Sequence, residues 1–187
     1  MINMDKNDFN VIEEIKNIET QGTKLSNTQK ILLSTDGSVT SILDVLKGKI
    51  DIKTTKQEFQ EANDKIAKIL NIDEGEMFNY RVVIMHKDNM PLIYATSYTP
   101  LKRLTSEFKK DLTSADIPIG RILKKYNIES RREIRSIEIK KPNKELKEIF
   151  KIETDFLSRS YQIIHKNEIL ILIEEIFPLN SFIKSYE

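Results

Sequence analysis

The stretch FLSRSYQIIHKNEILILIEEIFP, Phe156–Pro178, decides the fold. Its two runs of β-branched, aromatic and other apolar residues flank a short polar turn at Lys166-Asn167, a pattern that predicts a β-hairpin. An earlier stretch, FNYRVVIMHKDNMPLIYATSYTP at Phe78–Pro100, has the same character and turns at KDNMP. We therefore predict two antiparallel hairpins. They are loosely similar to one another, although no internal repeat is visible in the sequence.

Segments with helical spacing surround these hairpins. Apolar residues three apart in residues 5–20 predict an amphipathic helix, and QGT at 21–23 breaks it. We expect residues 1–25 to form an N-terminal helical arm and residues 26–187 to form one domain. Further helices are predicted within 25–34, 41–48, 61–72, 101–112, 117–127 and 142–150, the last with proline in its first turn, and further strands within 49–59 and 130–141. Strand pairs with helices between them, without βαβ alternation, indicate an α+β fold with a mostly antiparallel sheet.

The composition excludes several classes of protein. The 187 residues include 30 lysines and arginines and 29 acidic residues, so the chain lacks the basic footprint of a nucleic-acid-binding protein. There is no cysteine, and two histidines are few for a metal site, so we predict no metal and no cofactor. No apolar run approaches the roughly 18 residues of a membrane span, and no signal peptide is recognisable. We expect a cytoplasmic protein, monomeric or a small homo-oligomer, without nucleic-acid or membrane partners.

Common catalytic motifs are also missing. The sequence contains no P-loop, GxGxxG, HExxH or GxSxG motif. Phosphoryl transfer, nicotinamide chemistry and triad hydrolysis therefore lose their usual support.

Charged residues inside apolar strands are the candidate functional residues. Glu174 and Glu175 are neighbours, and neighbours on a strand point to opposite faces, so one of them faces inward. A buried carboxylate needs a partner or a function. Arg81, between Tyr80 and Val82, is either a residue at a sheet edge or a guanidinium directed into a cavity. Each alone is compatible with a structural role. Together in one cavity, an arginine could hold a carboxylate and a glutamate could hold a hydroxyl.

Two turns before helices could bind an anion through backbone amides. These turns are TDGSVT, which contains Gly37, and DIPIGRIL, which contains Pro118 and Gly120. Ordinary helix capping by Ser38 or Thr40 is the alternative interpretation. A cluster of charges, most of which we expect in solvent, comprises Arg131, Arg132, Glu133, Arg135 and Arg159.

The order of these pieces resembles the chorismate lyase (chorismate-pyruvate lyase) superfamily, in particular its archaeal and mycobacterial-type branch. The matching pieces are TDGSVTSILDVLKG, FNYRVVIM, PLIYATSYTPLKRL, IPIGRILKKYNIESRREI and SRSYQIIHKNEILILIEEIFP, and they span roughly residues 30 to 178. The resemblance implies an antiparallel sheet covered by helices around an internal ligand pocket, a fold shared with UTRA effector-binding domains. It implies a lyase that removes pyruvate from chorismate and leaves 4-hydroxybenzoate.

The resemblance also implies roles for individual residues. Arg81 would hold the ring carboxylate, assisted by the backbone amides of Val39 and Ile119. Glu175 would meet the ether and phenol end, as an acid or as a group that orients the substrate for one concerted step. We add Thr40 and Arg159 as candidate residues for binding the substrate or product.

Two other functions stay open from the sequence. A UTRA-like module would bind a small aromatic acid without chemistry. A purely structural or protein-interaction role would be favoured if Arg81 and Glu175 only paired with each other.

Overall fold

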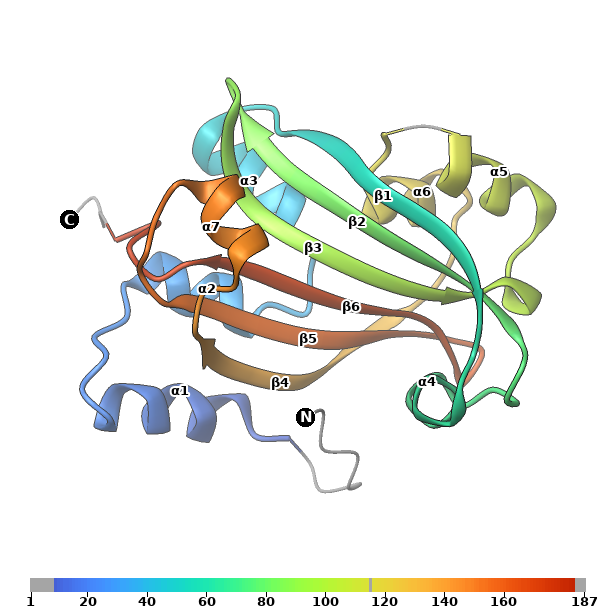
Figure 1. Cartoon of the computed structure of the whole chain (residues 1–187), viewed down its shortest axis with the longest axis horizontal. Coiled ribbons are helices and arrows are strands. Elements are labelled where there is room, and N and C mark those ends of the chain that lie inside the picture. The colour runs from blue at the N-terminus through green and yellow to red at the C-terminus, as the bar shows by residue number, and fades with distance from the viewer. Residues whose placement is uncertain (1–8, 115, 184–187) are drawn as a thin grey trace.

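The protein, described here by a computed structural model for residues 9–114 and 116–183, is built on one antiparallel sheet (Figure 1). The six strands of this sheet lie in the order β1-β2-β3-β6-β5-β4. They are β1 (Asp51–Glu61), β2 (Met77–Lys87), β3 (Met90–Pro100), β4 (Arg131–Lys140), β5 (Phe156–His165) and β6 (Glu168–Pro178). The α+β class and the antiparallel sheet predicted from the sequence are confirmed.

Helices cover both faces of this sheet. Those found in the described residues are α1 (Val11–Thr20), α2 (Asn27–Ser34), α3 (Val39–Lys47), α4 (Asp64–Leu70), the 3-10 helix η1 (Leu101–Arg103), α5 (Ser106–Ser114), α6 (Ile119–Lys125) and α7 (Lys144–Phe150). On one face, α1, α2 and α3 pack around Leu157 and Phe177, while α5 and α6 pack around Ile163 and Ile171. On the opposite face, α4 packs on β2 and α7 packs on the centre of the sheet. None of these helices is long and apolar enough to cross a membrane.

Both predicted hairpins are present, and both turn through two residues with positive φ. The pairs are Asp88-Asn89, at φ 48° and 64°, and Lys166-Asn167, at φ 50° and 64°. Two left-handed residues give the turn whose twist matches that of the flanking strands. Asparagine at the second position tolerates this conformation better than most residues. The turns therefore fix where each pair of strands starts.

A one-residue bulge near each turn then sets the final register. In the second hairpin His165 pairs with Glu168 and Ile164 with Ile169, but Ile163 pairs with Ile171, so Leu170 is the extra residue. Uninterrupted pairing from the turn would set Arg159 opposite Glu174. Because of the bulge, Arg159 is opposite Glu175 instead.

The first hairpin has the same construction, which reveals an internal repeat. Its extra residue is Leu92, the equivalent of Leu170. The same number of residues separates Leu92 from Leu170 and Arg81 from Arg159. The repeat is a structural one. It was not visible in the sequence, because backbone register recurs and residue identity does not. At the centre of the sheet Thr96 of β3 pairs with Glu174 of β6, and the same interval separates these two residues. The two halves are therefore related by a pseudo-two-fold axis through this pair.

Outside the hairpins the repeat continues at a slightly longer interval. Helices α4 and α7 occupy equivalent places in the two halves, and the side chains of Asn63 and Asn143 cap them in the same way. Pro142 precedes this second cap, so it lies just before α7 and not in its first turn as predicted. The bulges of β1 and β4, at Thr55 and Arg135, are separated by the same interval as the two caps.

The N-terminal helix packs on the domain. Helix α1 is capped by Asn10 and buries Ile18 in the same apolar cluster as Leu25 and Leu157. The predicted helix is confirmed over this range, and its predicted first residues, 5–8, lie outside the described residues. The boundary between arm and domain at residue 25 stays a prediction.

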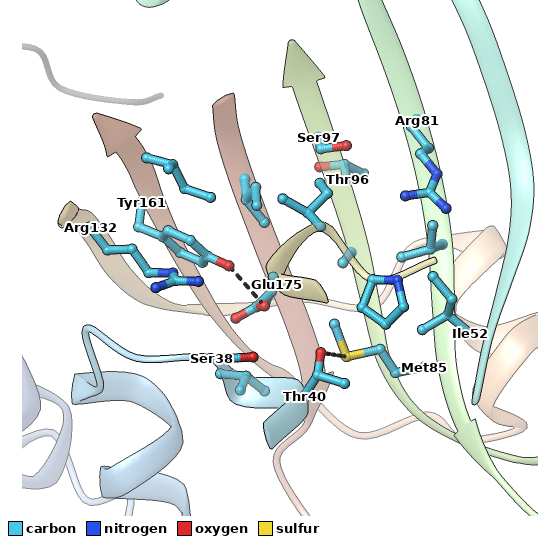
Figure 2. Close-up of a pocket in the computed structure, with 18 residues that line it drawn as sticks. Ser38, Thr40, Ile52, Arg81, Met85, Thr96, Ser97, Arg132, Tyr161 and Glu175 are labelled. Carbon is cyan, nitrogen blue, oxygen red and sulfur yellow. Dashed lines mark hydrogen bonds between the residues drawn. The ribbon is translucent and has the colours of Figure 1, made fainter. Parts of the chain in front are cut away.

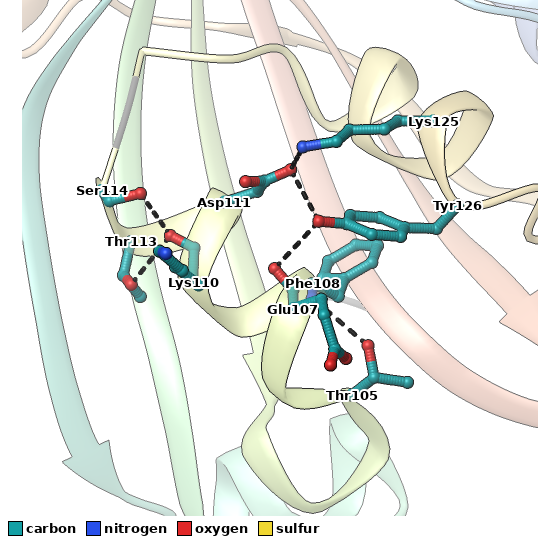
Figure 3. Close-up of polar contacts among 9 residues, drawn as sticks. All are labelled: Thr105, Glu107, Phe108, Lys110, Asp111, Thr113, Ser114, Lys125 and Tyr126. Carbon is teal, nitrogen blue, oxygen red and sulfur yellow. Dashed lines mark hydrogen bonds and ion pairs between the residues drawn. The ribbon is translucent and has the colours of Figure 1, made fainter.

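Polar contacts fasten α5 to α6, which begins beside the candidate site (Figure 3). The Tyr126 hydroxyl lies 2.9 Å from an Asp111 carboxylate oxygen and 3.2 Å from the Glu107 carbonyl oxygen. Lys125 forms an ion pair with the same carboxylate, and the rings of Phe108 and Tyr126 are in contact. These contacts hold the end of α6, and hence the direction of its first turn.

We predict that Tyr126→Phe lowers the free energy of unfolding by about 1 kcal/mol, the usual contribution of a hydrogen bond. The melting temperature should fall by roughly 2–4 °C, because the ring contact with Phe108 is retained. Lys125→Ala is the matched control and should cost less, since exposed ion pairs contribute little. A larger loss for Lys125→Ala than for Tyr126→Phe in urea unfolding would refute this assignment.

Candidate functional site

A cavity lies between the sheet and the first turns of α3 and α6 (Figure 2). About 50 Å³ of it is open to the centres of water molecules, whereas a single water needs about 10–15 Å³ by that measure, so the cavity has room for a small molecule. It is lined by Ser38, Val39, Thr40, Ile52, Arg81, Val83, Met85, Ala95, Thr96, Ser97, Pro118, Ile119, Gly120, Arg132, Tyr161, Ile163, Ile173 and Glu175.

Most of the predicted site residues meet in this cavity. Arg81, Val39, Thr40, Ile119 and Glu175 all line it, although they come from separate strands and from the starts of two helices. The strand register explains part of this meeting, since one cross-strand row runs from Arg81 through Ser97 and Ile173 to Tyr161. The functional roles of these residues stay predictions.

Glu175, not Glu174, is the inward glutamate. Its side chain is almost fully buried, and its two carboxylate oxygens accept hydrogen bonds from Arg159 Nε at 2.8 Å and from the Tyr161 hydroxyl at 3.1 Å. Glu174 lies on the other face, where it pairs with Lys140 and accepts a hydrogen bond from Ser158. Glu175 therefore does not depend on Arg81 as its partner, which was the condition for a purely structural role.

Arg159 is buried directly behind Glu175. Only 1% of it is exposed, so the expectation that it belongs to a solvated cluster is wrong. Its Nη1 donates to the Thr35 carbonyl at 2.8 Å, and its guanidinium lies 4.7 Å from the centre of the Tyr161 ring. Burial acts to lower the pKa of Arg159, but the charge of Glu175 and the interactions with Tyr161 together raise it. Arg159 thus stays a cation, and its predicted contact with a ligand stays a prediction.

Tyr161 is a site residue that the sequence reasoning missed. Burial, followed by the charge of Glu175, raises the pKa of Tyr161 well above its usual value. The phenol is therefore neutral, and its hydroxyl donates a hydrogen bond to Glu175. Its position two residues after Arg159 on the predicted hairpin was the available signal. The charges attracted attention there, whereas an aromatic residue in a strand is ordinarily part of the core.

Arg81 is directed into the cavity and is not an exposed edge residue (Figure 2). It is 1% exposed, its Nη1 donates to the Ile117 carbonyl at 3.2 Å, and its Nη2 donates to Thr54 Oγ1 at 3.0 Å. Burial lowers its pKa, and the charge of Asp116 acts in the opposite direction. An arginine remains charged through such shifts. The cavity therefore has a fixed cation at this end.

The starts of α3 and α6 meet at the cavity. The Ser38 side chain caps α3 by accepting from the Ser41 amide at 3.3 Å, and the Arg121 amide of α6 donates to the Pro118 carbonyl at 2.9 Å. The first two amides of a helix, here those of Val39, Thr40, Ile119 and Gly120, have no acceptor within their own helix. A Cβ atom on Gly120 would lie 3.2 Å from Ser38 Oγ and 3.8 Å from Arg132 Nη2. Glycine at this position therefore lets the two helix starts and Arg132 approach one another.

A cavity lined by the cations Arg81 and Arg132 within an α+β domain suits a small-molecule site, and comparison with known proteins gives the family of the chain. The chain belongs to the Rv2949c-like chorismate pyruvate-lyase family, whose family model matches residues 33–184. It is 44% identical over 162 residues to "Putative lyase MJ0807" of Methanocaldococcus jannaschii, covering 83% of this chain and 80% of that protein.

Solved structures with a similar fold include bacterial transcriptional regulators and an effector domain of one of them. The effector domain of PhnF from Mycobacterium smegmatis superposes with a TM-score of 0.66 at 12% identity, covering 76% of this chain and 88% of that one. A GntR-family transcriptional regulator from Bacillus cereus gives a TM-score of 0.57 at 11% identity, covering 74% and 96%. The predicted relationship of the fold to these effector domains is confirmed.

We predict that Arg159→Met lowers the free energy of unfolding by about 3–5 kcal/mol, because it leaves the buried Glu175 carboxylate without its cationic partner. Adding Glu175→Leu should recover most of that loss, since an apolar pair of similar volume replaces the ion pair. Urea unfolding of the two variants measures both values. If the double variant were no more stable than Arg159→Met, the loss would come from packing and not from the unpaired charge.

Proposed function

We propose that this chain removes pyruvate from chorismate and leaves 4-hydroxybenzoate. The observation that carries the proposal is the meeting of Arg81, Glu175 and two helix starts in one small cavity, in a member of the chorismate pyruvate-lyase family. Arg81 and the amides of Val39 and Ile119 bind the ring carboxylate. A guanidinium matches a carboxylate in geometry and charge, and amides of helix first turns add donors to the same anion.

The reaction then needs two changes in the ring. The bond between the ring and the ether oxygen breaks, and the ring carbon that bears the hydroxyl loses its proton. The ring becomes aromatic, the departing enolpyruvate takes up a proton at its methylene carbon, and pyruvate results. No electrons leave the system, so the step requires no oxidant or reductant.

Glu175 acts at the ether and hydroxyl end of the substrate. In its protonated form Glu175 can give a proton to the ether oxygen, whereas as a carboxylate it can orient the substrate hydroxyl while a concerted step proceeds. Arg159 and Tyr161 fix its position through their hydrogen bonds to its two oxygens. Because both partners are buried, the carboxylate is held in one orientation before the substrate arrives, which favours either role.

We predict that purified wild-type protein releases pyruvate and 4-hydroxybenzoate from chorismate, and that Glu175→Gln lowers kcat by roughly 10²–10⁴, the usual contribution of a positioned acid or base. Glu174→Gln is the matched control, since it makes the same change on the opposite face of the same strand. It should change kcat less than about two-fold, as expected for a group outside the cavity. Coupled detection of pyruvate with ultraviolet detection of the aromatic acid measures both. Equal activities of wild type and Glu175→Gln would remove Glu175 from the mechanism.

A non-catalytic module that binds an aromatic acid is the second candidate, because the solved structures of this fold include effector domains of regulators. The two functions differ in one measurement. Binding of 4-hydroxybenzoate by calorimetry, without pyruvate release from chorismate above the buffer rate, would favour the module and refute the lyase. In both cases Arg81→Gln should weaken the binding of 4-hydroxybenzoate by roughly ten-fold or more, since a charge-assisted pair is lost.

A further inference from the structure

Arg132 forms the end of the cavity opposite Arg81 (Figure 2). Arg81 is on β2 and Arg132 is on β4, with β3, β6 and β5 between them. Four steps of about 4.8 Å separate the two backbones by roughly 19 Å across the sheet. Figure 2 shows the Tyr161 hydroxyl and Glu175 in the interval between the two guanidinium groups. The cavity therefore has a cation at each end and hydrogen-bonding groups between them.

The Arg132 guanidinium has donors that the protein does not satisfy. Its Nη1 donates to the Asp36 carbonyl at 3.3 Å, while its Nε is buried and has no hydrogen-bond partner among the described residues. No ion pair within residues 9–114 and 116–183 includes Arg132. A buried donor without an acceptor is costly, and a bound carboxylate would satisfy it and balance the charge.

The fold itself does not require an arginine at this position. The repeat makes Ile52 of β1 the equivalent of Arg132, and Ile52 lines the same cavity from the first half. The fully buried arginine of the second half, Arg159, is already neutralised by Glu175. Arg132 is thus the cation that the second half contributes to the cavity without a carboxylate partner among the described residues.

We propose that Arg132 binds the second carboxylate of the substrate, the one on the enolpyruvyl side chain, and so makes the site selective for a dicarboxylate. This inference rests on the proposed function. Chorismate carries one carboxylate on the ring and one on the side chain, and cleavage leaves one on each product. The ring carboxylate stays with Arg81, and the pyruvate carboxylate stays with Arg132 until release. Arg132 therefore contributes to binding chorismate but not to binding 4-hydroxybenzoate.

The test compares Arg132→Gln with Arg131→Gln, which removes the same charge from the neighbouring, exposed residue. Arg132→Gln should raise the KM for chorismate roughly 10- to 100-fold, the effect of losing one charge-assisted pair. The dissociation constant for 4-hydroxybenzoate should change less than about two-fold, and Arg131→Gln should alter neither value. Arg132→Lys, which keeps the charge without the bidentate geometry, should fall between wild type and Arg132→Gln.

The possible outcomes separate this inference from the proposed function. If wild type releases pyruvate and Arg132→Gln has an unchanged KM, the inference is overturned while the lyase stands. If Arg132→Gln weakens chorismate and 4-hydroxybenzoate equally, Arg132 shapes the cavity generally and the inference also fails. If wild type releases no pyruvate, the proposed function fails, and calorimetry with the stable dicarboxylate 3-(carboxymethoxy)benzoate then decides. The dicarboxylate site is supported if Arg132→Gln and Arg132→Lys bind this compound more weakly than Arg131→Gln does. It is refuted if the three variants bind the compound equally.

Discussion

The buried ion pair between Arg159 and Glu175 is the interaction on which the site depends, and a single bulge creates it. Two charges removed from water stabilise a fold only when their geometry is good and their other hydrogen bonds are satisfied. Both conditions follow from the extra residue Leu170, which sets Arg159 opposite Glu175 across the β5–β6 pair. If β5 and β6 paired from the turn without a bulge, Arg159 would lie opposite Glu174. The inward carboxylate would then lack its cation, and the cavity would have neither an oriented acceptor nor a balanced charge.

The repeat explains how one cavity acquires two different ends. Each half supplies a helix start and a set of facing strand residues to the cavity. Arg81 of the first half lines the cavity, whereas its equivalent in the second half, Arg159, lies behind Glu175. The halves differ in the residues at equivalent positions: Val83, Ser97 and Ile52 in the first half correspond to Tyr161, Glu175 and Arg132 in the second. The first half therefore presents one cation, Arg81, among hydroxyl and apolar side chains. The second half presents the hydroxyl, carboxylate and guanidinium groups of Tyr161, Glu175 and Arg132.

Much of this fold follows from local sequence, whereas the site depends on register. The Lys166-Asn167 turn, the Ser38 cap and the helical spacing of residues 64–70 are local signals, and each is found where it was predicted. The choice between Glu174 and Glu175 is not local, because alternation makes both faces equally apolar and the bulge at Leu170 has no recognisable residue pattern. The resemblance to a known family made that choice, and the structure confirms that Glu175 faces inward. Arg132 and Tyr161 were missed for the same reason, since an arginine among charges and a tyrosine in a strand have ordinary explanations until the cavity is seen.

The turn before α3 joins these features into one unit. Arg159 binds the Thr35 carbonyl and Arg132 binds the Asp36 carbonyl, so two arginines from neighbouring strands hold consecutive peptides of the same turn. The Gly37 amide closes this turn by donating to Thr35 Oγ1 at 3.0 Å, and the Ser38 cap follows directly. The direction of the Val39 and Thr40 amides therefore depends on two guanidinium groups. Arg159 also orients Glu175, and Arg132 also lines the cavity. Arg159, Arg132 and the start of α3 thus form one hydrogen-bonded network, which reaches Glu175 through Arg159.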